Sequence, residues 1–203
     1  MIQNKQDAIQ IAEILLNINA VKLQPSSFFT WASGKKSPIY CDNRLLLSHI
    51  KERNIIRDLF CKCINTNFKN IDYIAGVATG AIAHGMMIAE KLNLPFIYVR
   101  GEAKGHGRQN QIEGHLIKNS NIVLIEDLIS TGGSSLKAIE AIQSNGSNVI
   151  GLLSIFTYGF CNMDIIKTPY YSLCDYPTLI EVAINSKLIN QTEKEILFEW
   201  QDK

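Results

Sequence analysis

Apolar residues follow two alternating patterns in the middle of the chain, which together predict an α/β fold. Short apolar runs predict buried strands, and these runs lie at residues 72–76, 96–99, 122–125 and 148–156. After the first and third runs, apolar residues recur three or four positions apart, as they do in helices. Because strands and helices alternate from residue 72 to 156, we expect a central, mostly parallel sheet flanked by helices. Such sheets bind ligands at the carboxyl ends of their strands.

The flanking regions add helices and short strands. Helical spacing of apolar residues predicts one helix at residues 5–18 and another at residues 48–64. Thr178 and Thr192 are each followed by Glu three residues later, which predicts a capping box at the start of two C-terminal helices. Shorter strands are expected at residues 39–41, 111–116 and 170–173.

Residues 122–135, IVLIEDLISTGGSS, combine acids, hydroxyls and glycines at one strand-to-helix switch. The apolar run ends at Glu126 and Asp127, and a turn rich in hydroxyls and glycine follows. Backbone N–H groups at a helix start form an anion site, and phosphate is its usual occupant. The two acids would repel a phosphate. We therefore expect them to face sugar hydroxyls or a hydrated Mg²⁺ on the same ligand.

The alternative interpretation is an ordinary turn whose acids favour the helix dipole. A ligand site is the better interpretation because acids, hydroxyls and glycines occur together here. The turn is not a P-loop, since no Lys follows the glycines, and it lacks the Gly-x-Gly-x-x-Gly pattern of dinucleotide sites.

Two further segments carry candidate ligand contacts. A glycine-rich stretch with little to bury holds four basic residues: Arg100, Lys104, His106 and Arg108. Such a polar stretch is normally functional or disordered, and beside a phosphate turn it predicts a mobile lid that closes over an anion. Taken alone, its histidine would more often be a plain surface residue. The Thr79-Gly80 turn follows the first apolar run, and its small residues let a ligand approach the backbone.

Bulk properties narrow the classes of function. The 203 residues are 46% hydrophobic, which suits a single domain spanning residues 1–203. With 20 basic and 19 acidic residues the formal charge is +1, so nothing favours nucleic acid or a membrane surface as a partner. Five cysteines without a compact framework indicate reduced thiols, and no stretch reaches the roughly 18 apolar residues of a membrane span. We therefore expect a cytoplasmic protein.

The stretch at residues 122–135 resembles the phosphoribosyl-diphosphate signature of type I phosphoribosyltransferases. Three more segments narrow the likeness: FTWASGKKSPIYCDNR (29–44), VRGEAKGHGRQNQIEG (99–114) and SIFTYG (154–159). Together they resemble the orotate phosphoribosyltransferases, in their short bacterial monofunctional form, over nearly the whole chain. The resemblance implies a type I phosphoribosyltransferase-like fold, with a small hood built from about residues 1–45 and from the mobile basic loop.

The resemblance also implies a reaction and a set of site residues. Orotate and phosphoribosyl diphosphate would give orotidine 5′-phosphate and pyrophosphate, in pyrimidine (UMP) biosynthesis. Glu126, Asp127 and Lys104 are implied as catalytic, and Ser130 and Tyr40 as contacts of orotate. The implied contacts of phosphoribosyl diphosphate are Thr79, Gly80, Arg100, Lys104, His106, Glu126, Asp127, Leu128, Ile129, Ser130, Thr131, Gly132, Gly133 and Ser134.

The implied cofactor is Mg²⁺, held through the diphosphate and water with no direct protein ligand. In this family the basic loop reaches the neighbouring subunit's site, so a homodimer with shared active sites is implied. Two alternatives stay open at this point: a phosphoribosyltransferase for another nucleobase, and a regulator of the same fold that senses phosphoribosyl diphosphate and binds DNA. The regulator predicts a DNA-binding appendage or basic face, and the balanced charge counts against it.

Overall fold

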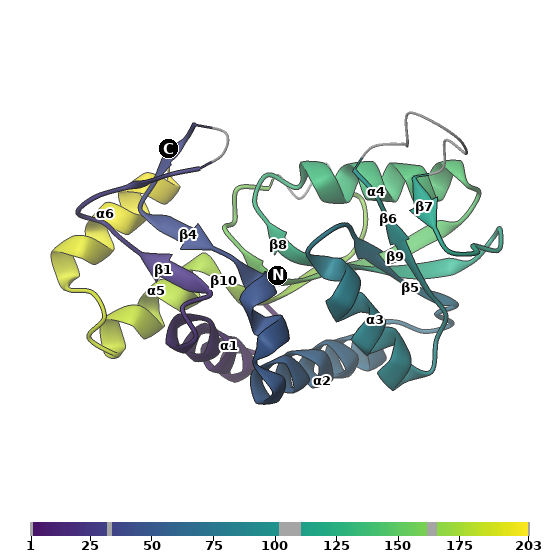
Figure 1. Cartoon of the computed structure of the whole chain (residues 1–203), viewed down its shortest axis with the longest axis horizontal. Coiled ribbons are helices and arrows are strands. Elements are labelled where there is room, and N and C mark those ends of the chain that lie inside the picture. The colour runs from purple at the N-terminus through teal and green to yellow at the C-terminus, as the bar shows by residue number, and fades with distance from the viewer. Residues whose placement is uncertain (1, 32–33, 102–110, 162–165, 203) are drawn as a thin grey trace.

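The computed structural model describes residues 2–31, 34–101, 111–161 and 166–202. These residues form one six-stranded sheet in the order β10-β9-β8-β5-β6-β7 (Figure 1). Neighbouring strands are parallel except at the β6–β7 edge, where the pairing is antiparallel. The strands are β5 (Tyr73–Val77), β6 (Phe96–Val99), β7 (Ile112–Glu113), β8 (Asn121–Ile129), β9 (Asn148–Thr157) and β10 (Tyr170–Asp175).

Helices cover both faces of this sheet, as the alternating pattern predicts (Figure 1). One face carries α4 (Gly133–Ser144). The other carries α3 (Ala81–Leu92), with α2 (Ile50–Asn67) and α1 (Lys5–Asn17) packed beside it. Two more helices, α5 (Tyr176–Asn185) and α6 (Gln191–Gln201), follow β10. None of the described helices is long and apolar enough to cross a membrane.

Alternate residues of β8 enter two separate cores, which explains why its apolar run is continuous. Ile122 and Leu124 pack in the cluster on the α4 side, whereas Val123 and Ile125 pack in the cluster formed with the other helices. All four side chains are fully buried. A strand that is buried on both faces needs an apolar residue at every position, so β8 is fixed at the centre of the sheet.

The hood consists of two small antiparallel pairs before α2. β1 (Val21–Leu23) pairs with β4 (Ile39–Cys41), and β2 (Phe29–Thr30) pairs with β3 (Lys36–Ser37). Figure 1 shows the hood beside α5 and α6, beyond one end of the sheet. A 3₁₀-helix, Asn43–Ser48, leads from β4 to α2.

The two predicted capping boxes were wrong, by three residues for the first helix and by two for the second. α5 begins at Tyr176, because the side chain of Asp175 accepts from the backbone N–H of Thr178 at 3.0 Å and Pro177 follows in the first turn. α6 has a true capping box, formed by Asn190 and Glu193 rather than by the predicted threonine. In both cases a nearby Asp or Asn side chain takes the capping position that the pattern had given to Thr.

Candidate active site

β8 continues four residues beyond its apolar run, so the two acids lie within a strand rather than in a loop. Its pairing with β9 extends to Ile129, opposite Thr157. Its pairing with β5 stops at Ile125, opposite Gly76. The end of β8 is therefore paired on one side and open toward the start of α3 on the other.

Glu126 lies in the cavity wall at the end of β8, with only 5% of its surface exposed. The Ser135 hydroxyl donates to its Oε2 at 3.2 Å, and the backbone N–H of Asp127 donates to its Oε1 at 3.3 Å. Burial, and then the charge of Asp127, raise the pKa of the Glu126 carboxyl well above its usual range. Two adjacent acids in one low-dielectric site therefore resist carrying two negative charges.

Asp127 lies against the start of α3. A Cβ built on Gly80 would collide with the Asp127 carboxylate, so only glycine permits this approach. Gly80 is also the N-cap of α3, directly after Thr79. The structure thus brings the Thr79-Gly80 turn to the acidic end of β8, although 47 residues separate Gly80 from Asp127.

Gly132 forms the sharp turn that leads into α4. Its φ of 83° is left-handed, and an added Cβ would stand 2.5 Å from the Sγ of Cys161. Neither Gly132 nor Gly80 has a side chain that could cap its helix, whereas Asn4, Asp175 and Asn190 cap α1, α5 and α6 with side-chain oxygens. The first N–H groups of α3 and α4 are therefore open to an anion.

A cavity of about 450 Å³ opens at this turn. The predicted site residues in its wall are Glu126, Leu128, Ile129, Ser130, Thr131, Gly132, Gly133 and Ser134. Three residues that were not predicted as ligand contacts join them: Gly101, Ser135 and Lys137. Ser135 and Lys137 fall in the first turns of α4, and this helical continuation of the motif was the signal that could have identified them.

The remaining predicted residues lie outside this wall or outside the described residues. Arg100 directly follows β6; its backbone N–H donates to the Gln111 carbonyl at 2.8 Å, and its side chain pairs with Glu113 at 3.4 Å. Tyr40 lies in β4, 41% exposed, with its ring 5.9 Å from that of Phe29. Lys104 and His106 fall outside the described residues.

Comparison with known proteins assigns the family. Residues 46–184 match the phosphoribosyl transferase domain family. An orotate phosphoribosyltransferase of Staphylococcus epidermidis is 48% identical over 199 residues, which cover 96% of this chain and 98% of that protein. The chain belongs to the orotate phosphoribosyltransferase family. As the resemblance implied, its fold is that of the type I phosphoribosyltransferases, with a mostly parallel sheet flanked by helices.

Solved structures agree with this family assignment. The orotate phosphoribosyltransferase of Aeropyrum pernix superposes with a TM-score of 0.77 at 29% identity, covering 89% of this chain and 99% of that one. UMP synthase of Leishmania donovani gives a TM-score of 0.83 at 25% identity, covering 98% of this chain but only 43% of that longer one. In this chain the four strands of the hood lie before residue 46, outside the region that matches the family. The residues that line the cavity all lie within that region.

Proposed function

We propose that this protein transfers the phosphoribosyl group from phosphoribosyl diphosphate to orotate, giving orotidine 5′-phosphate and pyrophosphate in pyrimidine biosynthesis. One observation carries the proposal. The end of β8 and the start of α4 place a buried acid and a glycine-capped helix start in the wall of one cavity. The family membership supports orotate as the base.

We propose that the acids stabilise the ribose during the reaction. Breaking the bond between the anomeric carbon and the diphosphate oxygen builds positive charge on the ribose ring, while the electron pair leaves with pyrophosphate. A carboxylate that hydrogen-bonds the ribose hydroxyls opposes that developing charge in a site with little water. Asp127, half-buried at the end of β8, suits this role, and the protonated form of Glu126 can donate a hydrogen bond beside it.

The turn from Thr131 to Ser134 is proposed to hold the 5′-phosphate. Its support is the uncapped start of α4, where backbone N–H groups and the helix dipole both favour an anion. Ser130, between the acids and this turn, and Tyr40 are proposed to contact orotate. Thr79, Gly80, Arg100, Lys104 and His106 are proposed to contact the diphosphate, because charge accumulates there as the bond breaks.

We propose Mg²⁺ as the cofactor, bound through diphosphate oxygens and water. The Asp127 carboxylate near the end of β8 and the hydroxyls of the turn are oxygen groups that could hydrogen-bond the waters of a hydrated Mg²⁺ without binding the ion directly. Mg²⁺ usually keeps several waters and binds through substrate phosphates rather than through an all-protein cage. When bound, it would neutralise charge on the leaving pyrophosphate.

The organisation of the active protein is also a proposal. We propose a single domain over residues 1–203, acting in the cytoplasm as a homodimer with shared active sites. The five free cysteines support a reducing compartment. The likeness of the basic loop to that of the family supports the shared site.

Orotate consumption tests the reaction. Purified protein with phosphoribosyl diphosphate and Mg²⁺ should consume orotate, followed by its ultraviolet absorbance, and release one pyrophosphate per orotate. Adenine, guanine, hypoxanthine and uracil serve as control bases. Release of pyrophosphate with one of these bases and not with orotate would overturn the choice of substrate.

Subunit mixing tests the shared site. Lys104→Ala subunits are mixed with Asp127→Asn subunits and allowed to exchange. If the loop acts across the interface, a mixed dimer has one site with both substitutions and one with neither, so activity returns to about half the wild-type value if the sites are independent. If the loop acts within its own subunit, every site carries one substitution, and no activity returns although mass spectrometry shows exchange.

A further inference from the structure

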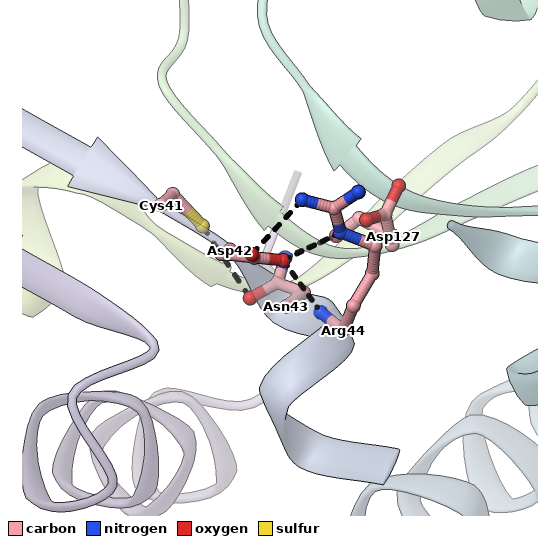
Figure 2. Close-up of polar contacts among 5 residues, drawn as sticks. All are labelled: Cys41, Asp42, Asn43, Arg44 and Asp127. Atoms are coloured by element: carbon pink, nitrogen blue, oxygen red, sulfur yellow. Dashed lines mark hydrogen bonds and ion pairs between the residues drawn. The ribbon is translucent and has the colours of Figure 1, made fainter. Parts of the chain in front are cut away.

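The segment that leaves the hood touches the main chain of Asp127. Asn43, the first residue of the 3₁₀-helix, is only 1% exposed. Its Nδ2 donates to the carbonyl oxygen of Asp127 at 2.6 Å, although the two residues are 84 positions apart (Figure 2). This contact joins the hood to the residue whose carboxylate is proposed to face the ribose.

The Asp127 carbonyl lies where the sheet no longer supplies a partner on one side. The described pairing between β5 and β8 ends at Ile125, two residues earlier. A buried carbonyl without a donor is costly, and the amide of Asn43 supplies one in place of the missing strand. Because the bond is to the main chain, it fixes the residue without occupying the carboxylate oxygens.

The orientation of the Asn43 amide is set from its other end. The Cys41 thiol donates to Asn43 Oδ1 at 3.4 Å, which turns Nδ2 toward Asp127 (Figure 2). Burial, and then the charges of Asp127 and Asp42, raise the pKa of Cys41, so the thiol keeps the proton that it donates.

Neither of the two basic side chains nearby, Arg44 and His84, takes the place of Asn43 as the donor to the Asp127 carbonyl. Arg44 is held by Asp42, with Nε to Oδ1 at 2.7 Å and Nη2 to Oδ2 at 2.9 Å (Figure 2). His84 of α3 is 2% exposed, and its Nε2 has no hydrogen-bond partner among the described residues. Burial lowers the pKa of His84 more than the Asp127 charge and the Asn43 backbone raise it, so the ring is neutral near pH 7.

We propose that Asn43 is a positioning residue for the transfer reaction: through the Asp127 carbonyl it sets where the Asp127 carboxylate stands relative to the ribose. The proposal rests on the proposed function of the site. Misplacing a catalytic group by about 1 Å through a change outside the chemistry can lower the rate about 10²-fold. The loss of Asn43 should therefore reduce kcat, while binding of phosphoribosyl diphosphate at the α4 turn remains.

Asn43→Asp gives the sharpest test, because the introduced carboxyl donates to the Asp127 carbonyl only while it is protonated. The charged groups around it are Asp127 from β8, and Asp42 and Arg44 from its own segment, while Glu126 beside Asp127 has a raised pKa. His84 and the Cys41 thiol add no charge near pH 7. Burial and the surplus of carboxylates raise the pKa of the introduced group. We expect a kcat within about threefold of wild type near pH 6, falling up to about 10²-fold by about pH 8.

Two further variants keep the test decisive. Asn43→Ala should lower kcat at both pH values, with the KM for phosphoribosyl diphosphate within about threefold of wild type. Asn67→Asp is the matched control, because Asn67 Nδ2 also donates to a carbonyl, that of Cys63 at 2.8 Å, but lies at the end of α2 away from the cavity. Its kcat should follow the wild-type pH profile.

The outcomes separate the two proposals. Wild-type protein that releases no pyrophosphate with orotate sinks the proposed function and this inference with it. Active wild-type protein, with Asn43→Ala within twofold in kcat or with Asn43→Asp showing no additional pH dependence, overturns the positioning role alone. If Asn43→Asp does not fold, the split between kcat and KM in Asn43→Ala decides: a rise in KM alone counts against positioning.

Discussion

Two neighbouring strands end at the same edge of the sheet and carry opposite kinds of side chain. β8 carries two acids near its end, and a hydroxyl- and glycine-rich turn follows it. β9 ends beside Tyr158 and Phe160, whose rings stack 5.6 Å apart. The first end is polar and includes a buried carboxyl, whereas the second is the start of an aromatic cluster.

The aromatic cluster joins the hood to the C-terminal helix. Trp31 of the hood lies 5.4 Å from Tyr158 and 5.8 Å from Trp200 of α6. The indole N–H of Trp200 donates to the Lys36 carbonyl at 3.0 Å, and Lys35 lies 4.9 Å above the ring of Phe160. One strand end therefore carries the proposed chemistry, while its neighbour supplies packing energy that holds the hood in place.

Trp200→Ala should have the largest effect on stability. The side chain is 5% exposed and contacts several rings, so its removal should lower the free energy of unfolding by about 3–5 kcal/mol, measured by urea denaturation. Trp200→Phe, which keeps most of the ring contacts, is the control and should lose less. A loss below about 1 kcal/mol for Trp200→Ala would show that the cluster does not hold the hood.

Asp127→Asn should have the largest effect on chemistry. Removing the charge opposite the developing cation should lower kcat by about 10²–10³-fold, while thermal denaturation shows an intact fold. Glu181→Gln on the exposed face of α5 is a control that also neutralises one acid and should keep the wild-type kcat. A kcat for Asp127→Asn within threefold of wild type would exclude this role for the acid.

Gly132→Ala should weaken binding of phosphoribosyl diphosphate by about tenfold, or about 1.4 kcal/mol. The new Cβ strains a left-handed residue and meets Cys161, which displaces the N–H groups of the turn. Gly133→Ala is the matched control, since its Cβ meets only Thr131 Oγ1 at 4.0 Å. A calorimetric affinity of the Gly132→Ala variant equal to that of the wild type would mean that the turn does not hold the phosphate.

Glu126→Gln should have the smallest effect of the four, and it should stabilise the protein. Because the folded state raises the pKa of Glu126, folding favours its protonated form, and stability falls as pH rises from the ordinary carboxyl value through the raised one. The amide cannot ionise, so near pH 7 we expect a Tm higher by about 2–4 °C, or about 1 kcal/mol for this size. At low pH the difference should vanish. An equal or lower Tm at pH 7 would contradict the cost assigned to this buried acid.

The sequence predicted the parts of the fold that depend on local pattern. The predicted strand at residues 96–99 matches β6, and the one at 39–41 matches β4, because each is a short apolar run between turn residues. The continuation of β8 to Ile129 was missed, since it depends on pairing with β9 and not on the local residues. β1, β2 and β3 were missed for a similar reason: each has only two or three residues and is defined by its partner.

In the candidate site too, features set by neighbouring residues along the chain were predicted, whereas features set by distant partners were not. The acids and the phosphate turn follow one another along the chain, so their spacing was readable from the sequence. The contact from Asn43 to Asp127 was not, because it joins residues 84 positions apart and the segment around Asn43 gives no sign of which residue it contacts. The buried carboxyl of Glu126 was also hidden, because burial is set by elements that pack around it.

A crystal structure of the protein with phosphoribosyl diphosphate and Mg²⁺ tests the central claim most directly. The claim predicts the 5′-phosphate in the cavity at the start of α4, accepting hydrogen bonds from backbone N–H groups of residues 131–134, with the ribose hydroxyls facing Glu126 and Asp127. A 5′-phosphate bound elsewhere, or a ribose turned away from both acids, would contradict the claim that the end of β8 carries the chemistry.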